Sequence, residues 1–294
     1  MLGNGRGAQT QQPTWRLALL CTAAALLCAN FLYGGRLLQQ GYRHDTDYTL
    51  IARGAAPPSY GLNLVCWSAA LAPASDTADF RQAYTAWREV ALRELAGTGA
   101  LIYPFDALHI TIATPAPSLH AGHAAWGVEE RALYTRAWTA ALEARPCAPS
   151  RPSFPLVMHP ALRLSPAGTV ALQWDDPTGE VSRMRECARE AAAALPPRLQ
   201  GMLAAAGFKA PSAGFVHTTL LRLAEPRREG VTDADIEEAW GRAARAWERM
   251  VAQRIELVTA RSAALVQGTE LVNLAGPRPR DFVLWEQGGS SSKA

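Results

Sequence analysis

Two short strings in this chain of 294 residues share one pattern, in which a threonine follows a histidine by two positions. They are His109–Ile112, read HITI, and His217–Leu220, read HTTL, and both lie in runs of residues that favour β-strands. Side chains alternate across a strand, so His109 shares a face with Thr111, and His217 shares a face with Thr219. Two such strands can bring two imidazoles and two hydroxyls into one polar site.

These four side chains suit the cleavage of a phosphodiester without a metal ion. A neutral imidazole can take a proton from an attacking water, while a protonated imidazole gives one to the leaving oxygen. The phosphoryl oxygens gain negative charge in the transition state, and hydroxyl groups can donate hydrogen bonds to them. We therefore predict that His109 and His217 are catalytic, that Thr111 and Thr219 bind the substrate phosphate, and that no cofactor or metal is needed.

The elements predicted around the two strings repeat in the order helix, motif strand, helix. Hydrophobic spacing, turn residues and helix breakers set their approximate bounds. In chain order we expect a strand at 60–68, a helix at 77–96, a strand within 100–114, a helix at 128–144, a hairpin of 154–164 with 169–174, a helix at 178–195 that breaks at Pro196, a strand at 214–223, a helix at 233–251 with Thr232 as N-cap, and strands at 255–258, 263–266, 271–274 and 282–285.

The paired motifs, their separation and this order of elements resemble the 2H phosphoesterase superfamily over about residues 60–285. That superfamily includes ligT-like RNA 2′,3′-cyclic phosphodiesterases and plant cyclic phosphodiesterases. The resemblance implies an α+β fold of two pseudo-symmetric lobes with a central groove between β-sheets. It also implies a phosphoric diester hydrolase that acts on a nucleotide or short RNA end, at a 2′,3′-cyclic or 2′,5′ linkage. His109, His217, Thr111 and Thr219 occupy the motif positions.

An apolar stretch near the N-terminus, from Leu17 to Tyr33, contains no charged residue and has arginines on both sides. It is just long enough to span a bilayer if residues up to 38 extend it, which predicts a transmembrane signal-anchor at 17–38 and a single-pass membrane protein. A signal peptide cleaved near Asn30 is the alternative. Arginines on both flanks leave the orientation and the organelle open.

The predicted organisation places a polar N-terminus at 1–16 before this segment and a linker at 39–58 after it. The 2H phosphoesterase-like domain then covers 59–286, and a loose tail covers 287–294.

The formal net charge of +3 is mild and does not indicate a nucleic-acid surface. Five cysteines without a C-x-x-C pair predict neither a disulfide framework nor a zinc site. Walker A, Rossmann and G-x-S-x-G motifs are absent, which excludes those classes.

Other residues have weaker patterns. Tyr103 and Phe105 share the parity of His109, so either ring can stack on a base or belong to the core. Arg222 suits a phosphate clamp but has the wrong parity relative to His217 unless the strand bulges. His120 and His123 have the spacing of a metal pair, although the surrounding residues favour a loop. The alternative functions are a nucleotide-binding module with little chemistry and a membrane-anchored interaction domain.

Overall fold

The computed structural model describes residues 41–44, 61–67, 75–117, 126–151, 153–210, 215–267 and 280–286. The chain divides into two units, Met1–Gly41 and Tyr42–Ala294, and the described residues other than Gly41 belong to the second. The predicted segments 1–16, 17–38 and 287–294 lie outside the described residues. So do most of the predicted linker, the strand predicted at 271–274, and the pair His120 and His123.

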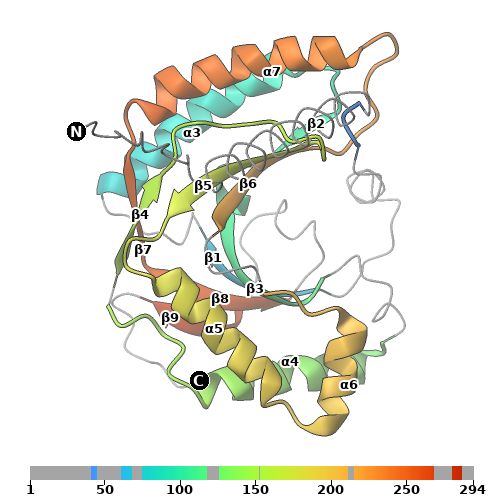
Figure 1. Ribbon diagram of the computed structural model, residues 1–294, viewed down its shortest axis with the longest axis vertical. Helices are drawn as coiled ribbons and strands as arrows, with labels where there is room; N and C mark the ends of the chain where they lie inside the picture. The colour runs from blue at the N-terminus through green and yellow to red at the C-terminus, as the bar shows by residue number, and fades with distance from the viewer. Residues whose placement is uncertain are drawn as a thin grey trace, which may run out of the picture. The chain divides into compact units, whose positions relative to one another are not determined.

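The strands of the second unit form one nine-stranded antiparallel sheet (Figure 1). Its order is β7-β4-β5-β6-β3-β1-β8-β9, and the short β2 pairs with β6. The strands are β1 (Leu62–Trp67), β2 (Ala100–Ile102), β3 (His109–Ala116), β4 (Phe154–Met158), β5 (Thr169–Asp175), β6 (Val216–Leu223), β7 (Leu257–Ala260), β8 (Ser262–Gln267) and β9 (Arg280–Glu286).

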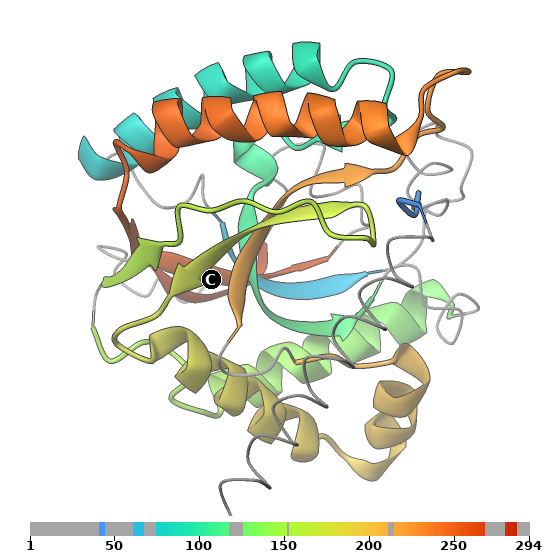
Figure 2. The ribbon, with the colours of Figure 1, turned by 45° about the horizontal axis from the view of Figure 1, so that its top comes forward.

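Helices cover both halves of this sheet. They are α3 (Ser75–Glu94), α4 (Val128–Glu143), α5 (Glu180–Ala193), α6 (Pro197–Ala206) and α7 (Asp233–Trp247), with a 3-10 turn η1 (Phe105–Ala107) and a π-turn η3 (Glu248–Ala252). Figures 1 and 2 show α3 and α7 side by side on one half of the fold, where α3 contacts β7 and β2. On the other half, α5 and α6 contact β3, and α4 contacts β9. Thr232 is the N-cap of α7, as predicted, and its side chain accepts a hydrogen bond from the Asp235 N–H.

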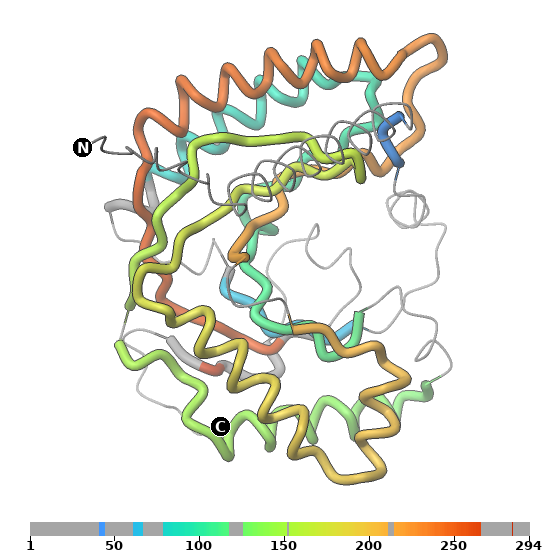
Figure 3. Tube along the Cα trace, in the orientation of Figure 1, coloured from blue at the N-terminus to red at the C-terminus, as the bar shows by residue number. Residues whose placement is uncertain are grey.

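The prediction of two lobes with a groove between separate β-sheets is wrong, although the α+β class is right. The two motif strands pair with each other, with Ile110 of β3 opposite Thr218 of β6. Since β3 also pairs with β1, and β6 with β5, one sheet runs from β7 to β9. Figure 3 shows the traces of β3 and β6 meeting near the middle of the fold. Alternation along each strand predicts its two faces but does not reveal its neighbours, so the sequence left this pairing open.

The predicted fold also included a transmembrane helix over residues 17–38. That segment lies outside the described residues. Within the part of the chain that the structure describes, no helix has the length and apolar character that crossing a bilayer requires. The fold given by the structure is thus α+β without a membrane span in its described part.

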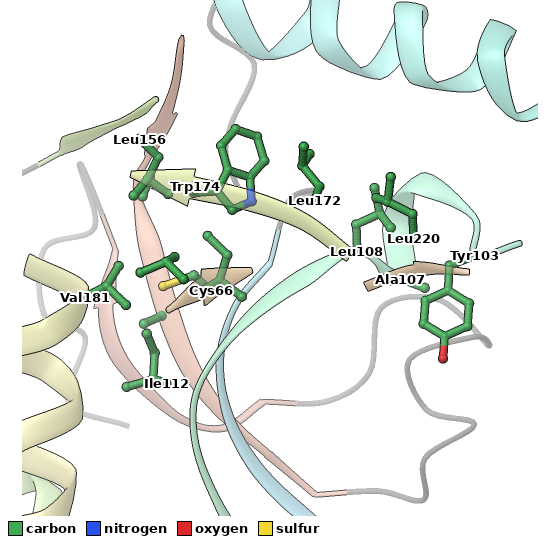
Figure 4. Packing of buried hydrophobic residues seen from close by; sticks show 14 of the residues in the cluster. Cys66, Tyr103, Ala107, Leu108, Ile112, Leu156, Leu172, Trp174, Val181 and Leu220 are labelled. Atoms are coloured by element: carbon green, nitrogen blue, oxygen red, sulfur yellow. The ribbon is translucent and has the colours of Figure 1, made fainter. Parts of the chain in front are cut away.

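The core lies between the sheet and its helices. Helical spacing on α3 puts an aromatic row against the sheet, and Trp87 from this row packs edge-on against Trp247 of α7, with ring centroids 5.0 Å apart. The Trp87 Nε1–H donates to the Ala243 carbonyl at 3.0 Å, which satisfies the buried indole. Figure 4 shows other core residues, including Leu108 and Leu220 next to each other. This packing holds the motif strands on a rigid support.

A disulfide joins Cys147, just after α4, to Cys187 of α5. The sequence predicted no disulfide framework, because the three cysteines outside the N-terminal segment are an odd number and include no C-x-x-C pair. The pairing depends on the packing of α4 against α5, which brings the two Cα atoms to 5.4 Å. The bond fixes α5, and α5 also carries a buried arginine that reaches the motif strands.

Candidate active site

The pairing of Ile110 with Thr218 determines how the four predicted site residues lie. In this antiparallel register, His109 is opposite Thr219, and Thr111 is opposite His217. Directly opposed residues on neighbouring strands have Cβ atoms about 5 Å apart. All four side chains are partly buried, whereas the residues between them are buried. The structure therefore gathers the four residues on one face of the sheet, here named the histidine face.

The opposite face of the two strands belongs to the core. Thr218 is 1% exposed, and its Oγ1 accepts a hydrogen bond from Trp174 Nε1 at 3.0 Å. Figure 4 shows Trp174 among the core residues of the neighbouring strands. Thr218 therefore has a structural role, and only Thr219 of this threonine pair lies beside the histidines.

Strand β6 contains a bulge immediately after its motif. Val170 of β5 is opposite Leu221, but the next residue of β5, Ala171, is opposite Thr219. Leu220 is thus the extra residue, and both Leu220 and Leu221 are buried. The extra residue reverses the alternation, so the partly buried Arg222 lies on the histidine face. The sequence indicated that Arg222 could share a face with His217 only if the strand bulges, and the structure contains that bulge.

Strand β3 has an irregularity at the same place relative to its histidine. Its register with β1 shifts between Thr111 and Ala113, and Ile112 and Ala113 are both buried. The sixth position of this motif, Thr114, is again partly buried. From the histidine to the sixth residue, the two strands therefore have the same order of partly buried and buried residues.

Arg222 is held in place by Tyr103. The Arg222 Nε–H donates to the Tyr103 hydroxyl at 3.0 Å, and the Tyr103 N–H donates to the Leu220 carbonyl. Tyr103 is only 3% exposed, and its hydroxyl is directed away from Leu108 and Leu220 (Figure 4). A ring this deeply buried orients the guanidinium and leaves little surface on which a base can stack.

Phe105, the other predicted stacking residue, lies in the core. Its ring packs against Phe80 and Tyr84 with centroid distances of 5.5 and 5.9 Å, and the Arg81 guanidinium lies 4.8 Å from its centroid. His159 Nε2 lies 2.8 Å from Asp175 Oδ1, within hydrogen-bond distance. Within the described residues, no three histidine, cysteine or acidic side chains gather as they would around a metal ion.

His109 is oriented by the backbone that precedes it. Its Nδ1 lies 2.9 Å from the Ala107 carbonyl, which can only accept, so Nδ1 carries the hydrogen. Nε2 is then the nitrogen available for proton exchange. Burial lowers the pKa of His109, the Ala107 carbonyl opposes this effect, and the charge of Arg222 adds to it.

The pKa of His217 is lowered to about 4. Burial is the largest cause, followed by the charges of Arg185, His109 and Arg222. Its Nδ1 is buried and has no hydrogen-bond partner among the described residues. The nearby Phe215 carbonyl acts in the opposite direction and raises the pKa of His217. That carbonyl also accepts a hydrogen bond from Arg185. His217 is therefore neutral over most of the pH range in which proteins are stable.

Arg185 connects the two motif strands from the core side. It is 0% exposed on α5, and its Nη1 donates to the Phe215 carbonyl at 2.9 Å while Nη2 donates to the Thr111 carbonyl at 3.0 Å. Burial lowers the pKa of Arg185 to about 10, which leaves it charged. The sequence interpretation missed this residue. Its signal was an arginine at helical spacing from Val181 and Ala188, on the apolar side of a helix.

Comparisons with known proteins leave the chain without an assigned family. No family model matches it, and no curated protein matches it. A solved structure of a conserved protein of unknown function from Agrobacterium tumefaciens is similar, with 16% sequence identity and a TM-score of 0.46. The similarity covers 79% of this chain and 89% of that chain.

Proposed function

We propose that this chain hydrolyses a nucleotide or oligonucleotide phosphodiester, at a 2′,3′-cyclic or 2′,5′ linkage, by general acid–base catalysis with two histidines. The observation that carries the proposal is the register of Ile110 with Thr218. It gives each histidine a threonine directly opposite, so two proton-transfer groups and two hydroxyl donors lie together on one face of the sheet. A phosphate bound there contacts donors from both strands.

We assign the base to His217 and the acid to His109. Burial and nearby positive charge lower the pKa of His217 to about 4, so its neutral form is favoured. The Ala107 carbonyl on His109 Nδ1 favours the protonated form of that ring. In the reaction, water loses a proton to His217 and attacks phosphorus. The bond from phosphorus to a ribose oxygen breaks, and His109 protonates that oxygen to leave a phosphomonoester and a hydroxyl.

Arg222 supplies the positive charge that the phosphate requires. It lies on the histidine face, and its charge lowers the pKa of both imidazoles. A guanidinium held by Tyr103 can donate to phosphoryl oxygens together with Thr111 and Thr219. A bound phosphate carries negative charge and raises the pKa of both histidines, so substrate binding itself favours protonation of His109.

A nucleotide-binding module with little chemistry is the second candidate. The lowered pKa values of both histidines favour this candidate, because they favour the neutral imidazoles in the free site. The protonated imidazole that a general acid requires is then a minor form near pH 7. Turnover separates the two functions, since a binding module protects the fold against unfolding when nucleotide is added but releases no product.

The decisive experiment follows hydrolysis of the four nucleoside 2′,3′-cyclic phosphates and of a 2′,5′-linked dinucleotide by ³¹P NMR. We expect a phosphomonoester product, unchanged rates in EDTA, and loss of turnover in His109→Gln and His217→Gln. His44→Gln is the matched control, since His44 is hydrogen-bonded to the Glu225 carbonyl and takes no part in the proposed site. Full activity in the double histidine variant, or restoration by zinc or manganese after EDTA, would contradict the proposal.

A further inference from the structure

An exposed aromatic ring lies against the histidine that we assign as base. Phe215 precedes β6, is 44% exposed, and stacks on the His217 imidazole with ring centroids 4.6 Å apart and an interplanar angle of 28°. The other described large hydrophobic residues with comparable or greater exposure are aliphatic: Leu92, Val128 and Leu257. An aromatic ring with this much exposed surface contributes little to the core and offers its surface to a planar ligand.

A side-chain amide lies next to the same histidine on the neighbouring strand β5. Gln173 of β5 is opposite His217, and the alternation of β5 puts Gln173 on the histidine face while Leu172 and Trp174 are buried. One strand further, the His159 N–H donates to the Gln173 carbonyl at 3.0 Å. The region beyond His217 is therefore lined by a stacking ring and by an amide that can both donate and accept hydrogen bonds.

Charge separates the two ends of the histidine face along β6. Phe215 lies at one end, His217 and Thr219 follow, and Arg222 lies at the other. The guanidinium end suits the charged phosphate. The end with Phe215 and Gln173 suits an uncharged planar group with hydrogen-bonding edges, which describes a nucleobase.

We propose that Phe215 and Gln173 form a nucleobase subsite beside His217, in which the base stacks on Phe215 and its edge is hydrogen-bonded by the Gln173 amide. This inference rests on the proposed function and makes it narrower. The substrates are phosphodiesters that carry a nucleobase, and the base is part of what the enzyme recognises. Asn and Gln amides pair with base edges, and stacking on an aromatic ring tolerates any base. Phe215 then provides affinity, and Gln173 provides preference among bases.

The test compares nucleoside 2′,3′-cyclic phosphates with glycerol 1,2-cyclic phosphate, which has the reacting phosphate but no base. In Phe215→Ala we expect the ratio of kcat/KM for the nucleotide to kcat/KM for the base-free compound to fall about 10-fold, mainly through KM. A purely structural role for Phe215 lowers both values and leaves the ratio unchanged. Leu257→Ala, which truncates another exposed apolar side chain, should change neither. In Gln173→Leu we expect the differences among the four nucleotides to shrink, whereas Gln253→Leu preserves them.

A binding experiment separates failure of the subsite from failure of the catalytic proposal. Titrations with adenosine 2′-monophosphate and with inorganic phosphate are run on the intact chain and on Phe215→Ala. Weaker nucleotide binding with unchanged phosphate binding supports the subsite even where no substrate is turned over. Equal loss or no loss for both ligands, together with an unchanged kcat/KM ratio, overturns it.

Discussion

Ile110 and Thr218 form a cross-strand pair, and each is the residue that follows the histidine of its own motif. Because equivalent positions face each other, the antiparallel register gives both histidines the same surroundings: a threonine two residues along the strand and the other motif's threonine across it. One pairing thus brings together residues that are more than a hundred positions apart. The proposed chemistry depends on this arrangement, and it can be tested residue by residue.

Loss of either imidazole should cost more than loss of either hydroxyl. His109→Gln and His217→Gln each remove a proton transfer, and we expect kcat to fall about 10²–10⁴-fold. Thr111→Val and Thr219→Val remove one hydrogen-bond donor while both proton transfers persist, so we expect about a 10-fold loss. Steady-state kinetics on a 2′,3′-cyclic nucleotide measures both effects. A threonine variant that is as impaired as the histidine variants would contradict the assigned roles.

The pH dependence of kcat/KM should be bell-shaped with its maximum on the acidic side of neutrality. The rising limb follows deprotonation of the base, His217, whose pKa is lowered to about 4. The falling limb follows deprotonation of the acid, His109, whose pKa burial lowers from the ordinary value of 6.5. Since both pKa values are lowered, the maximum is expected below about pH 6.5. For kcat, the bound phosphate raises both pKa values, and the profile should move to higher pH. A kcat/KM maximum above pH 8 would exclude this pair as acid and base.

Arg222 should matter through its charge, and Tyr103 through Arg222. Arg222→Leu removes a charged donor to the phosphate, and we expect kcat/KM to fall about 100-fold. Tyr103→Phe removes the hydroxyl that accepts from Arg222 Nε, and we expect kcat/KM to fall about 10-fold. Because Tyr103 acts through Arg222, adding Tyr103→Phe to Arg222→Leu should cause no further loss. Arg227→Leu, which breaks an exposed ion pair with Asp233, is the control. Unchanged kinetics in Arg222→Leu would show that the bulge has no catalytic role.

The local structure of the site was largely predictable from the sequence. The alternation of polar and aliphatic residues at His109–Ile112 and at His217–Leu220 was sufficient to predict which side chains share a face. Simple alternation along the strand predicted the wrong face for Arg222, because a bulge adds one residue and no local sequence pattern indicates it. The consecutive buried pair Leu220 and Leu221 follows from that extra residue.

The long-range relations were not predictable in this way. The direct pairing of β3 with β6 depends on which strand edges meet, and a strand's sequence specifies its faces far better than its neighbours. The disulfide between Cys147 and Cys187 depends on how two helices pack. Arg185 has a role only because its carbonyl partners, in Thr111 and Phe215, come from two distant segments. Each of these features arises from tertiary contacts rather than from local propensity.

The disulfide should contribute substantially to stability. It closes a loop with a sequence separation of 40, and the chain-entropy model gives about 3–4 kcal/mol for a loop of that length. We expect the double variant Cys147→Ala, Cys187→Ala to lose about this much free energy of unfolding in urea. Dithiothreitol should destabilise the native chain and leave the double variant unchanged. Equal sensitivity of both proteins to the reductant would show that the bond contributes little.

Arg185 should stabilise the fold and also set the protonation of His217. Arg185→Met leaves two partly buried carbonyl groups without their donors, and we expect a loss of about 2–3 kcal/mol in the free energy of unfolding. Removing its charge raises the pKa of His217, so the rising limb of kcat/KM should move to higher pH. Arg185→Lys keeps the charge but not the forked geometry, so it should lose stability while the limb stays near its original pH.

Arg189→Met is the matched control for this series, since Arg189 lies on the same helix and forms a more exposed pair with Glu186. We expect it to change the free energy of unfolding by at most about 1 kcal/mol. Urea denaturation and pH–rate profiles of the three variants separate the two roles of Arg185. If Arg185→Met and Arg185→Lys shift the limb equally, the effect comes from altered strand positions rather than from charge. If neither variant is less stable than Arg189→Met, the two carbonyl contacts do not hold the motif strands together.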